Sequence, residues 1–290
     1  MHECKKGGTL LVKIPKGEKR TVEQLQEHYK IEKDLASRLR HANKDERRYL
    51  YSTLYDELYR RVPHHPQLTC KKESRLRLVA VSKQMKLLKR FLSPESTFVE
   101  VGPGDCSLSI EVAKHVRKVY AIDVSKEITK GQTFPRNFKL IVSDGCSIPI
   151  PENTVSIAYS KDLMEHLHPD DATDQLQNIY KTLTHGGKYI CITPNRLSGP
   201  HDISKYFDNV ATGFHLKEYT TTELTELFCK VGFSKLSNYI GGRGFYLRFP
   251  SLPIKMCEEF LSVLPFSSRK IIARLLPFEA LLGVTMVGTK

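Results

Sequence analysis

The sequence predicts an α/β fold with a mostly parallel sheet whose last strand runs antiparallel. Strand-like and helix-like segments alternate from residue 97 to residue 240, a pattern typical of a parallel sheet covered by helices on both faces. A glycine turn, Gly102-Pro-Gly104, follows the first strand of this series. The final apolar segment, 283–289, follows a non-crossover connection, which fits an antiparallel strand.

The glycine turn predicts a ligand-binding crevice. Glycine allows positive φ and has no Cβ to keep a ligand from the backbone. The helix expected after the turn points its free N–H groups at the same place. Asp123 ends the next strand, 21 residues after Gly102, which is close to the spacing of an acid that binds a ribose diol. These features predict a nucleotide-like ligand.

The residues of this turn distinguish between the known kinds of nucleotide-binding site. A dinucleotide fingerprint needs a third glycine where this chain has Ser107, so an NAD-dependent enzyme is only a rival interpretation. No G-K-[ST] ending is present, which excludes a phosphate-gripping P-loop. A glycine turn in an unrelated α/β protein is the alternative that needs no ligand.

Further strands are expected at 138–142, 155–159, 188–193 and 233–240. Asp144 follows the first of these, and a carboxylate at that end of a parallel strand faces the crevice. A helix is expected over 169–183, with Gly186-Gly187 as its stop. The box formed by Thr220 and Glu223 predicts a helix over 221–231.

A polar cluster follows the strand at 155–159. Asp162, Glu165 and His166 are spaced i, i+3, i+4, so a helical turn would place them on one face. Two carboxylates beside an imidazole repel and lose hydration unless a positive group lies among them. A divalent cation would meet this need. The alternative is that Glu165 and His166 pack beside the ligand without a metal.

These motifs together resemble the class I S-adenosylmethionine (SAM) methyltransferases. The resemblance rests on Glu100-Val-Gly102-Pro-Gly104, Asp123, Asp144 and the polar cluster, and it covers about 97–244 and 283–290. It implies a Rossmann-like sheet and SAM as the cofactor. It also implies cofactor contacts from Glu100, Gly102, Gly104, Asp123, Asp144 and Ser160. The chain departs from the family at Cys106, where a further glycine is usual.

A narrower resemblance concerns the acid-x-x-Glu-His pattern. It is similar to the metal-binding turn of ubiquinone-pathway O-methyltransferases and of small-RNA terminal 2′-O-methyltransferases. In the RNA enzymes a histidine beyond the fifth strand completes the ligand set, and His215 falls in that place. The resemblance implies Mg²⁺ or Mn²⁺ held by Asp162, Glu165, His166 and His215, with His166 or His215 as the base. Asp162 departs from the glutamate of those families.

The chain divides into a basic, mostly helical N-terminal extension, 1–92, and a SAM-binding domain, 93–290. The extension carries a net charge of +12 out of +13 for the whole chain. Helices are expected over 21–42, 45–61 and 71–92, the last with Leu76, Val79, Met85, Leu88 and Leu92 on its apolar side. Tyr51, Tyr55 and Tyr59 form a stripe that either packs on a neighbour or stacks on bases.

An apolar helical insertion, 245–281, is expected before the last strand. It could lie on a membrane surface, wall an apolar substrate pocket or form a dimer contact. No uncharged apolar run is long enough to span a bilayer. Seven scattered cysteines without a C-x-x-C fit reduced thiols, so a cytoplasmic protein is expected.

The expected function is therefore SAM-dependent methylation of a hydroxyl on a small-molecule, lipid or sugar acceptor. An RNA ribose 2′-O-methyltransferase is the alternative that the basic extension favours. A non-catalytic SAM-binding subunit is the alternative outside enzymes.

Overall fold

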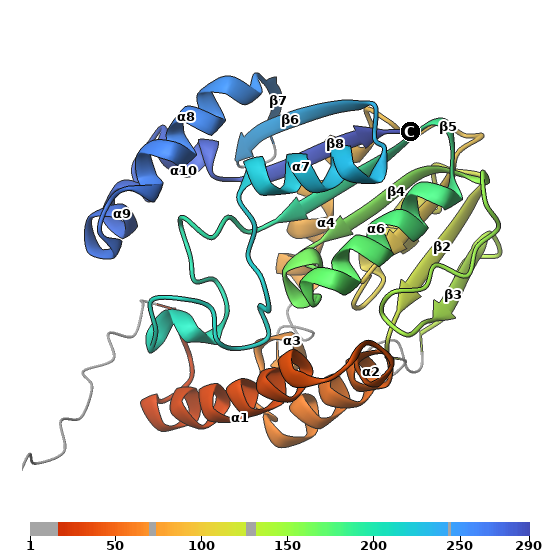
Figure 1. The fold of residues 1–290 in the computed structure, drawn as a ribbon. Coiled ribbons are helices and arrows are strands. Elements are labelled where there is room, and N and C mark those ends of the chain that lie inside the picture. Colours follow the sequence, from red (N-terminus) through yellow and green to blue (C-terminus); the bar gives the residue numbers. More distant parts are fainter. Residues whose placement is uncertain (1–16, 70–73, 126–131, 243–244) are drawn as a thin grey trace, which may run out of the picture.

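The computed structural model describes residues 17–69, 74–125, 132–242 and 245–290. Its centre is an eight-stranded sheet with the order β3-β2-β1-β4-β5-β8-β6-β7 (Figure 1). The strands are β1 (Thr97–Val101), β2 (Lys118–Asp123), β3 (Phe138–Val142), β4 (Val155–Lys161), β5 (Leu183–Thr193), β6 (Lys235–Gly242), β7 (Phe245–Phe249) and β8 (Val284–Thr289). The sequence also suggests a short strand over residues 9–14 and a short helix after Asp123; the strand lies outside the described residues, and the helix lies partly outside them.

The strands β1 to β5 pair in parallel, as the alternation of segments predicts. β8 inserts between β5 and β6 and runs antiparallel to both. The predicted antiparallel last strand is therefore confirmed. β7 adds a second antiparallel strand at the edge, where the sequence predicted the start of a helical insertion. That part of the prediction was wrong, because residues 245–249 pair with β6 instead.

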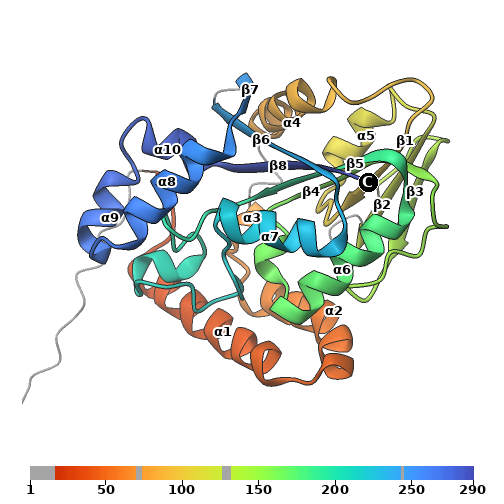
Figure 2. The same ribbon diagram turned by 45° about the horizontal axis from the view of Figure 1, so that its top comes forward.

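Helices cover both faces of the sheet (Figure 2). α6 (Pro169–Thr182) and α7 (Thr221–Val231) lie on one face, and α4 (Ser74–Leu88) and α5 (Ser107–Val112) lie on the other. Leu176 and Ile179 of α6 are fully buried on the sheet. α7 begins with the predicted capping box and ends at Gly232, whose φ of 114° only glycine adopts readily.

The predicted stop of α6 was wrong. The helix ends at Thr182, and Leu183 already has the extended dihedral angles of the next strand. Gly186 and Gly187 lie inside β5, which begins five residues earlier than predicted. A Cβ on Gly187 would come within 2.8 Å of the Thr184 carbonyl oxygen, so close backbone packing explains this glycine.

Residues 17–69 of the N-terminal extension lie across the carboxyl ends of the parallel strands (Figure 1). The helices of this part are α1 (Val22–His41), α2 (Lys44–Arg61) and the short α3 (Pro66–Thr69). Thr21 and Asn43 cap α1 and α2 through complete capping boxes. Leu35, Leu39, Leu54 and Leu58 are buried in the same core as α6, so the extension and the sheet share one interior.

α4 packs only through its second half. Met85 and Leu88 are buried against α5, as predicted. Leu76 and Val79 were predicted to be apolar contacts but are exposed, because the first turns of α4 extend past the core. Arg77, on this exposed part, forms an ion pair with Asp105 beside the glycine turn.

The insertion forms a separate layer at one end of the sheet. It contains α8 (Ser251–Ser262), α9 (Phe266–Ile272) and α10 (Phe278–Leu281). A small core of Leu197, Cys257, Leu261, Ala273 and Leu282 joins these helices to the loop after β5. No helix among residues 17–69, 74–125, 132–242 and 245–290 is both long and apolar enough to cross a bilayer.

Candidate active site

The glycine turn has the geometry of a binding loop. Gly102 has a φ of 71° and Gly104 has a φ of 54°, values that glycine adopts without steric cost. A Cβ on Gly104 would meet no atom within 4 Å, so this part of the backbone is open to a ligand. Cys106 also has a positive φ, 57°, which explains why a glycine is usual at this position in the family.

Asp123 lies beside this turn at the carboxyl end of β2. Its carboxylate accepts hydrogen bonds from the backbone N–H groups of Gly104 at 3.3 Å and Ser125 at 3.1 Å. Burial raises the pKa of Asp123, although these hydrogen bonds oppose the shift. The acid is therefore held in place next to the open backbone of Gly104.

A cavity opens over the turn. Its lining includes Gly102, Gly104, Asp123, the loop residues Ser143, Gly145 and Ser147, and Asp162, Leu163 and His166 from the segment after β4. Three predicted cofactor residues, Gly102, Gly104 and Asp123, thus face one space. The residues present fit the adenosine part of SAM, because an acid for hydroxyl groups stands beside unobstructed backbone.

The other three predicted cofactor residues do not line this cavity. Glu100 is buried, accepts a hydrogen bond from the Ser109 hydroxyl, and has its pKa raised to about 8 by burial. Ser160 is also buried and shares a 2.7 Å hydrogen bond with the Tyr189 hydroxyl. Asp144 accepts hydrogen bonds from the N–H groups of Cys146 and Ser147, so it stabilises the conformation of the loop that lines the cavity.

The tyrosine stripe of α2 forms the outer wall of the cavity. Tyr51, Tyr55 and Tyr59 all line it. Tyr51 is buried, and Tyr55 stacks on Phe214 with 5.0 Å between ring centroids. The stripe therefore packs on its neighbours, as one of the two interpretations held, and also faces the space over the glycine turn.

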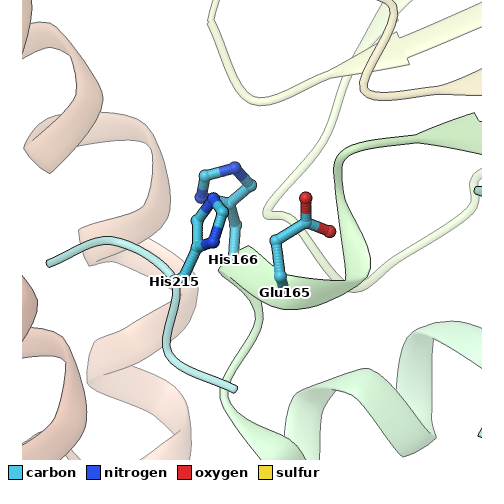
Figure 3. Close-up of side chains that lie close together, drawn as sticks. All are labelled: Glu165, His166 and His215. Atoms are coloured by element: carbon cyan, nitrogen blue, oxygen red, sulfur yellow. The ribbon is translucent and has the colours of Figure 1, made fainter. Parts of the chain in front are cut away.

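Glu165, His166 and His215 gather beside this cavity (Figure 3). Their ligand atoms lie within 4.8 Å of one another. Glu165 and His166 come from a 3-10 turn, Met164–His166, that follows β4, and His215 comes from the long loop after β5. The predicted meeting of the His215 loop with the cluster after β4 is what the structure shows.

Asp162 does not join this group. It has a φ of 52° and precedes the 3-10 turn, so the predicted single helical face over 162–166 was wrong. Its half-exposed carboxylate pairs with Lys161 instead. Asp162 still lines the cofactor cavity, but the residues that could hold a metal are three rather than the four predicted.

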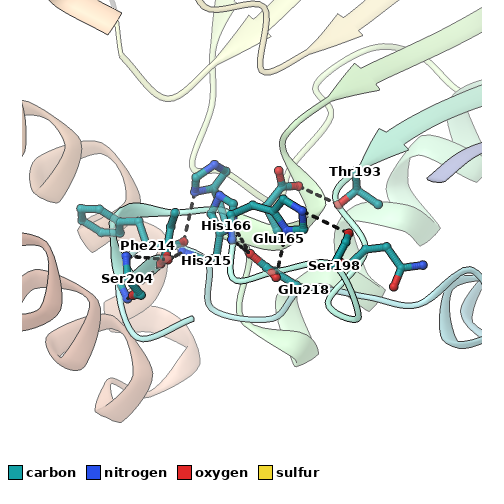
Figure 4. A network of polar contacts seen from close by, with 12 residues as sticks. Glu165, His166, Thr193, Ser198, Ser204, Phe214, His215 and Glu218 are labelled. Atoms are coloured by element: carbon teal, nitrogen blue, oxygen red, sulfur yellow. Dashed lines mark hydrogen bonds and ion pairs between the residues drawn. The ribbon is translucent and has the colours of Figure 1, made fainter. Parts of the chain in front are cut away.

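Hydrogen bonds orient both imidazole rings (Figure 4). His166 Nδ1 lies 3.0 Å from the carbonyl oxygen of Phe214, and His215 Nδ1 lies 2.7 Å from a carboxylate oxygen of Glu218. Because a carbonyl or carboxylate oxygen can only accept, each Nδ1 carries the hydrogen. This leaves each Nε2 as the nitrogen that could take a proton or a metal ion.

Glu165 has one partner and one free oxygen. The Thr193 hydroxyl donates to one carboxylate oxygen at 2.8 Å, while the other oxygen is buried and has no hydrogen-bond partner among the residues that the structure describes. Burial raises the pKa of Glu165 to about 7 and lowers the pKa of His166 to about 3. Burial also opposes the charge on His215, but the hydrogen bond to Glu218 and the nearby Glu165 raise its pKa overall.

This group fits a divalent cation. One carboxylate and two oriented imidazole nitrogens are common ligands of transition metals. The buried oxygen of Glu165 that has no hydrogen-bond partner among the described residues would gain a partner if it bound the cation. Glu218 would orient one of the metal ligands, because its carboxylate accepts a hydrogen bond from Nδ1 of His215 and fixes that ring.

Sequence reasoning missed Glu218 and the full role of Thr193. Glu218 follows His215 by three residues, a spacing that could have indicated the contact. Thr193 ends β5, at the edge where crevice residues collect, and that position was its only signal.

The comparison with known families decides the class of this site. Residues 99–191 match the family described as a methyltransferase domain. Residues 99–191 of the chain form a methyltransferase domain. The matched region contains the glycine turn, Asp123, Glu165 and His166. SAM is therefore the cofactor that the cavity over the turn of this methyltransferase is expected to hold.

Solved structures share the fold at low sequence identity. A Haloferax volcanii methyltransferase, solved with the Trm112 methyltransferase activator, is 16% identical over 72% of this chain and 88% of its own, with a TM-score of 0.51. A SAM-dependent methyltransferase from Archaeoglobus fulgidus is 15% identical over 73% and 93%, with a TM-score of 0.49. Another from Thermotoga maritima is 17% identical over 77% and 97%, also at 0.49. No curated protein sequence matches the chain.

Proposed function

We propose that this methyltransferase transfers the methyl group of SAM to a hydroxyl of a small-molecule, sugar or lipid acceptor. The observation that supports this most is the placement of Glu165, His166 and His215. His166 lines the cofactor cavity, and the other two residues stand within 4.8 Å of it. A hydroxyl must lose its proton during transfer, and this group offers proton acceptors and cation ligands where the methyl group would arrive.

The reaction needs little covalent chemistry from the protein. The acceptor oxygen attacks the methyl carbon, the carbon–sulfur bond breaks, and its electron pair stays on sulfur, giving S-adenosylhomocysteine. Two routes for the hydroxyl proton are alternatives. Without a cation in the site, Nε2 of His166 or of His215 accepts the proton. With a cation held by these nitrogens, the acidified hydroxyl would instead lose its proton to solvent. SAM already carries an activated methyl group, so alignment of oxygen, carbon and sulfur is the protein's main contribution.

A divalent cation such as Mg²⁺ or Mn²⁺ belongs to this proposal. Glu165, His166 and His215 would hold it, and when bound it would lower the pKa of the acceptor hydroxyl. Glu218 and the Phe214 carbonyl would keep the two rings in place. Asp162 is left out of the ligand set, because it pairs with Lys161.

The test uses labelled SAM, the full chain and fractionated small-molecule, lipid and RNA extracts. We expect label in small molecules or lipids, loss of turnover with EDTA, and recovery with Mn²⁺ or Mg²⁺. A Glu165→Gln/His215→Ala variant should lose bound metal and turnover but keep SAM affinity. His115→Ala, at a half-buried histidine outside the site, is the matched control. Turnover that EDTA does not reduce would exclude the cation from the proposal. Full activity of the double variant would overturn the proposal as a whole.

An RNA acceptor is the second candidate, since the N-terminal extension holds most of the net charge. Some of these basic side chains are already paired within the molecule. Arg38, Lys44, Arg47, Arg48 and Arg61 all pair with acidic residues. Label in RNA, with affinity that falls steeply with salt, would favour this candidate over a small acceptor.

Two other candidates have simple tests. A non-catalytic SAM-binding subunit would bind SAM but label no fraction. An NAD-dependent enzyme would show thermal stabilisation by NAD rather than by SAM.

We also propose that the insertion contacts a membrane surface. Nine of the fifteen large apolar side chains that are exposed in the described residues lie in this segment. They are Phe245, Leu247, Leu252, Met256, Phe260, Val263, Ile271, Leu275 and Leu276. An exposed apolar face of this kind with nearby arginine and lysine suits an anionic bilayer surface.

A further inference from the structure

A second cavity lies between the loop after β5 and the C-terminal helices. Thr193, Pro194 and Asn195 form one side of it, and the segment from Lys270 to Gly283 contributes the other. Its volume is about 1010 Å³, which is at the upper end of pockets that bind small molecules. This cavity is distinct from the one over the glycine turn.

Its lining brings together cations from two distant parts of the chain. Lys205 comes from the 3-10 turn Ile203–Tyr206, and Lys270 and Arg274 lie four residues apart around α9. Within the described parts of the chain, none of the three forms an ion pair with an acidic residue. Lys205 and Lys270 instead lie over the rings of Tyr206 and Phe266.

The charge of this lining favours an anion. Glu279 is the one acidic residue among the lining residues, so with three cations the formal charge is +2. Lys205 and Arg274 are exposed to solvent and Lys270 is half-buried, so an anion that enters the cavity can reach all three side chains.

Two hydrogen bonds link this cavity to the reactive group (Figure 4). Thr193 lines the cavity and donates to Glu165 at 2.8 Å. His201 also lines it and lies 3.3 Å from Glu218, the carboxylate that holds His215. Glu165 and His215 are therefore connected both to the cofactor cavity, through His166, and to this second cavity, which we call the basic cavity.

We infer that the basic cavity binds a phosphate monoester group of the methyl acceptor through Lys205, Lys270 and Arg274. A phosphate monoester carries a charge of about −2 at pH 7, which matches the +2 of the lining. The inference rests on the proposed function, because it assigns this cavity to the acceptor. A free phosphate ester and a phosphorylated lipid headgroup present the same chemistry to these side chains.

The test is a calorimetric titration of the SAM-saturated full chain with phenyl phosphate at constant ionic strength. Benzyl alcohol is the matched neutral probe. We expect phenyl phosphate to bind, and Lys270→Gln/Arg274→Gln to weaken it at least about tenfold, as expected for lost charge-assisted hydrogen bonds. Lys255→Gln/Lys230→Gln removes the same charge from exposed positions outside the cavity and should leave affinity unchanged.

SAM affinity of each variant separates the two proposals. Unchanged SAM affinity together with weakened phosphate binding supports the inference. The inference would be overturned, with SAM-dependent transfer left intact, by any of three results: no binding of either phenyl phosphate or the phosphatidic acid vesicles of the second arm, equal binding of benzyl alcohol, or an equal loss in the control pair. A second arm replaces the probe with vesicles containing phosphatidic acid, and binding only there assigns the phosphate to a lipid. Competition by single-stranded RNA at far lower concentration than phenyl phosphate would overturn the small-acceptor version.

Discussion

Arg47 and Asp171 form a buried, two-pronged ion pair although 124 residues separate them in the chain. The two nitrogen–oxygen distances are 2.6 and 2.8 Å. The Tyr51 hydroxyl donates to the same carboxylate at 2.8 Å. Burial disfavours the Asp171 charge, but these hydrogen bonds outweigh it and lower its pKa. The pair therefore fixes α2, with its tyrosine stripe, to α6 of the methyltransferase domain.

Replacing Arg47 should destabilise the whole chain. Arg47→Met leaves the Asp171 charge buried without its main partner, so we expect a loss of about 3–5 kcal/mol in the free energy of unfolding. Urea unfolding at pH 7 measures this loss. Arg48→Met is the control, since Arg48 is 43% exposed and pairs with Asp144 at 3.8 Å, and it should cost less than about 1 kcal/mol. Equal effects of both variants would contradict the role given to the buried pair.

Asp123 should determine SAM affinity. Asp123→Asn keeps the shape but removes the charge that would accept the ribose hydroxyl groups, and a lost charged hydrogen bond costs about 1.5–3 kcal/mol. We expect SAM affinity to fall by roughly 10- to 100-fold in calorimetry. Asp105→Asn, beside the same turn but paired with Arg77, is the matched control. Unchanged affinity in Asp123→Asn would mean that the cofactor lies elsewhere.

Glu100 should make stability depend on pH. Its pKa in the folded state is raised to about 8, so the folded chain holds a proton that the unfolded chain releases near pH 4.5. The stability contributed by the neutral carboxyl is complete below pH 4.5 and is lost as pH rises to about 8. Glu100→Gln stays neutral, so its stability relative to wild type should increase by at least about 2 kcal/mol between pH 5 and pH 9.

Urea unfolding across this pH range measures the effect. Glu111→Gln is the control, because Glu111 is part-exposed and Lys114 lowers its pKa. Its stability relative to wild type should not rise between pH 5 and pH 9. Parallel curves for wild type and Glu100→Gln would show that the carboxyl is ionised in the folded state.

Local patterns account for much of what the sequence predicted. The capping box at Thr220 marked a helix start correctly, because it depends on residues within one turn. The glycine turn and Asp123 were likewise identified from spacing within one strand-turn-helix-strand unit. The gathering of His215 with Glu165 came from the family resemblance, since no local pattern connects residues 50 positions apart.

The errors came from positions where distant contacts decide the structure. Gly186 and Gly187 have the local pattern of a helix stop, but they lie inside β5 and exchange backbone hydrogen bonds with Lys290. The spacing of Asp162 from Glu165 and His166 fits a helix, yet the positive φ of Asp162 is incompatible with a right-handed helix. Asp162 therefore lies outside the 3-10 turn that carries the other two residues. Leu76 and Val79 follow a helical stripe, although both side chains are exposed among the described residues. Periodicity shows which face is apolar but not whether a partner is present.

The exposed stripe of α8 gives the last prediction. Leu252, Met256 and Phe260 follow one another at four-residue spacing and are 67%, 61% and 48% exposed. A different stripe of the same helix, with Ile254 and Leu261, is already buried in the core. Two apolar stripes on one helix leave the outer one without a partner in the described chain, and a membrane surface would cover it.

Sedimentation with vesicles that contain anionic lipid tests this face. We expect wild type to sediment with them at low salt, and Met256→Ser/Phe260→Ser to reduce the bound fraction at least about tenfold, since each buried side chain of this size contributes about 1.5–3 kcal/mol. Val142→Ser/Val210→Ser removes exposed apolar side chains away from the insertion, and these variants should bind as wild type does. Failure of wild type to bind, or equal weakening by the control pair, would reject the membrane contact. A wild-type dimer that the α8 variant converts to a monomer would instead identify a second copy of the chain as the partner of this face.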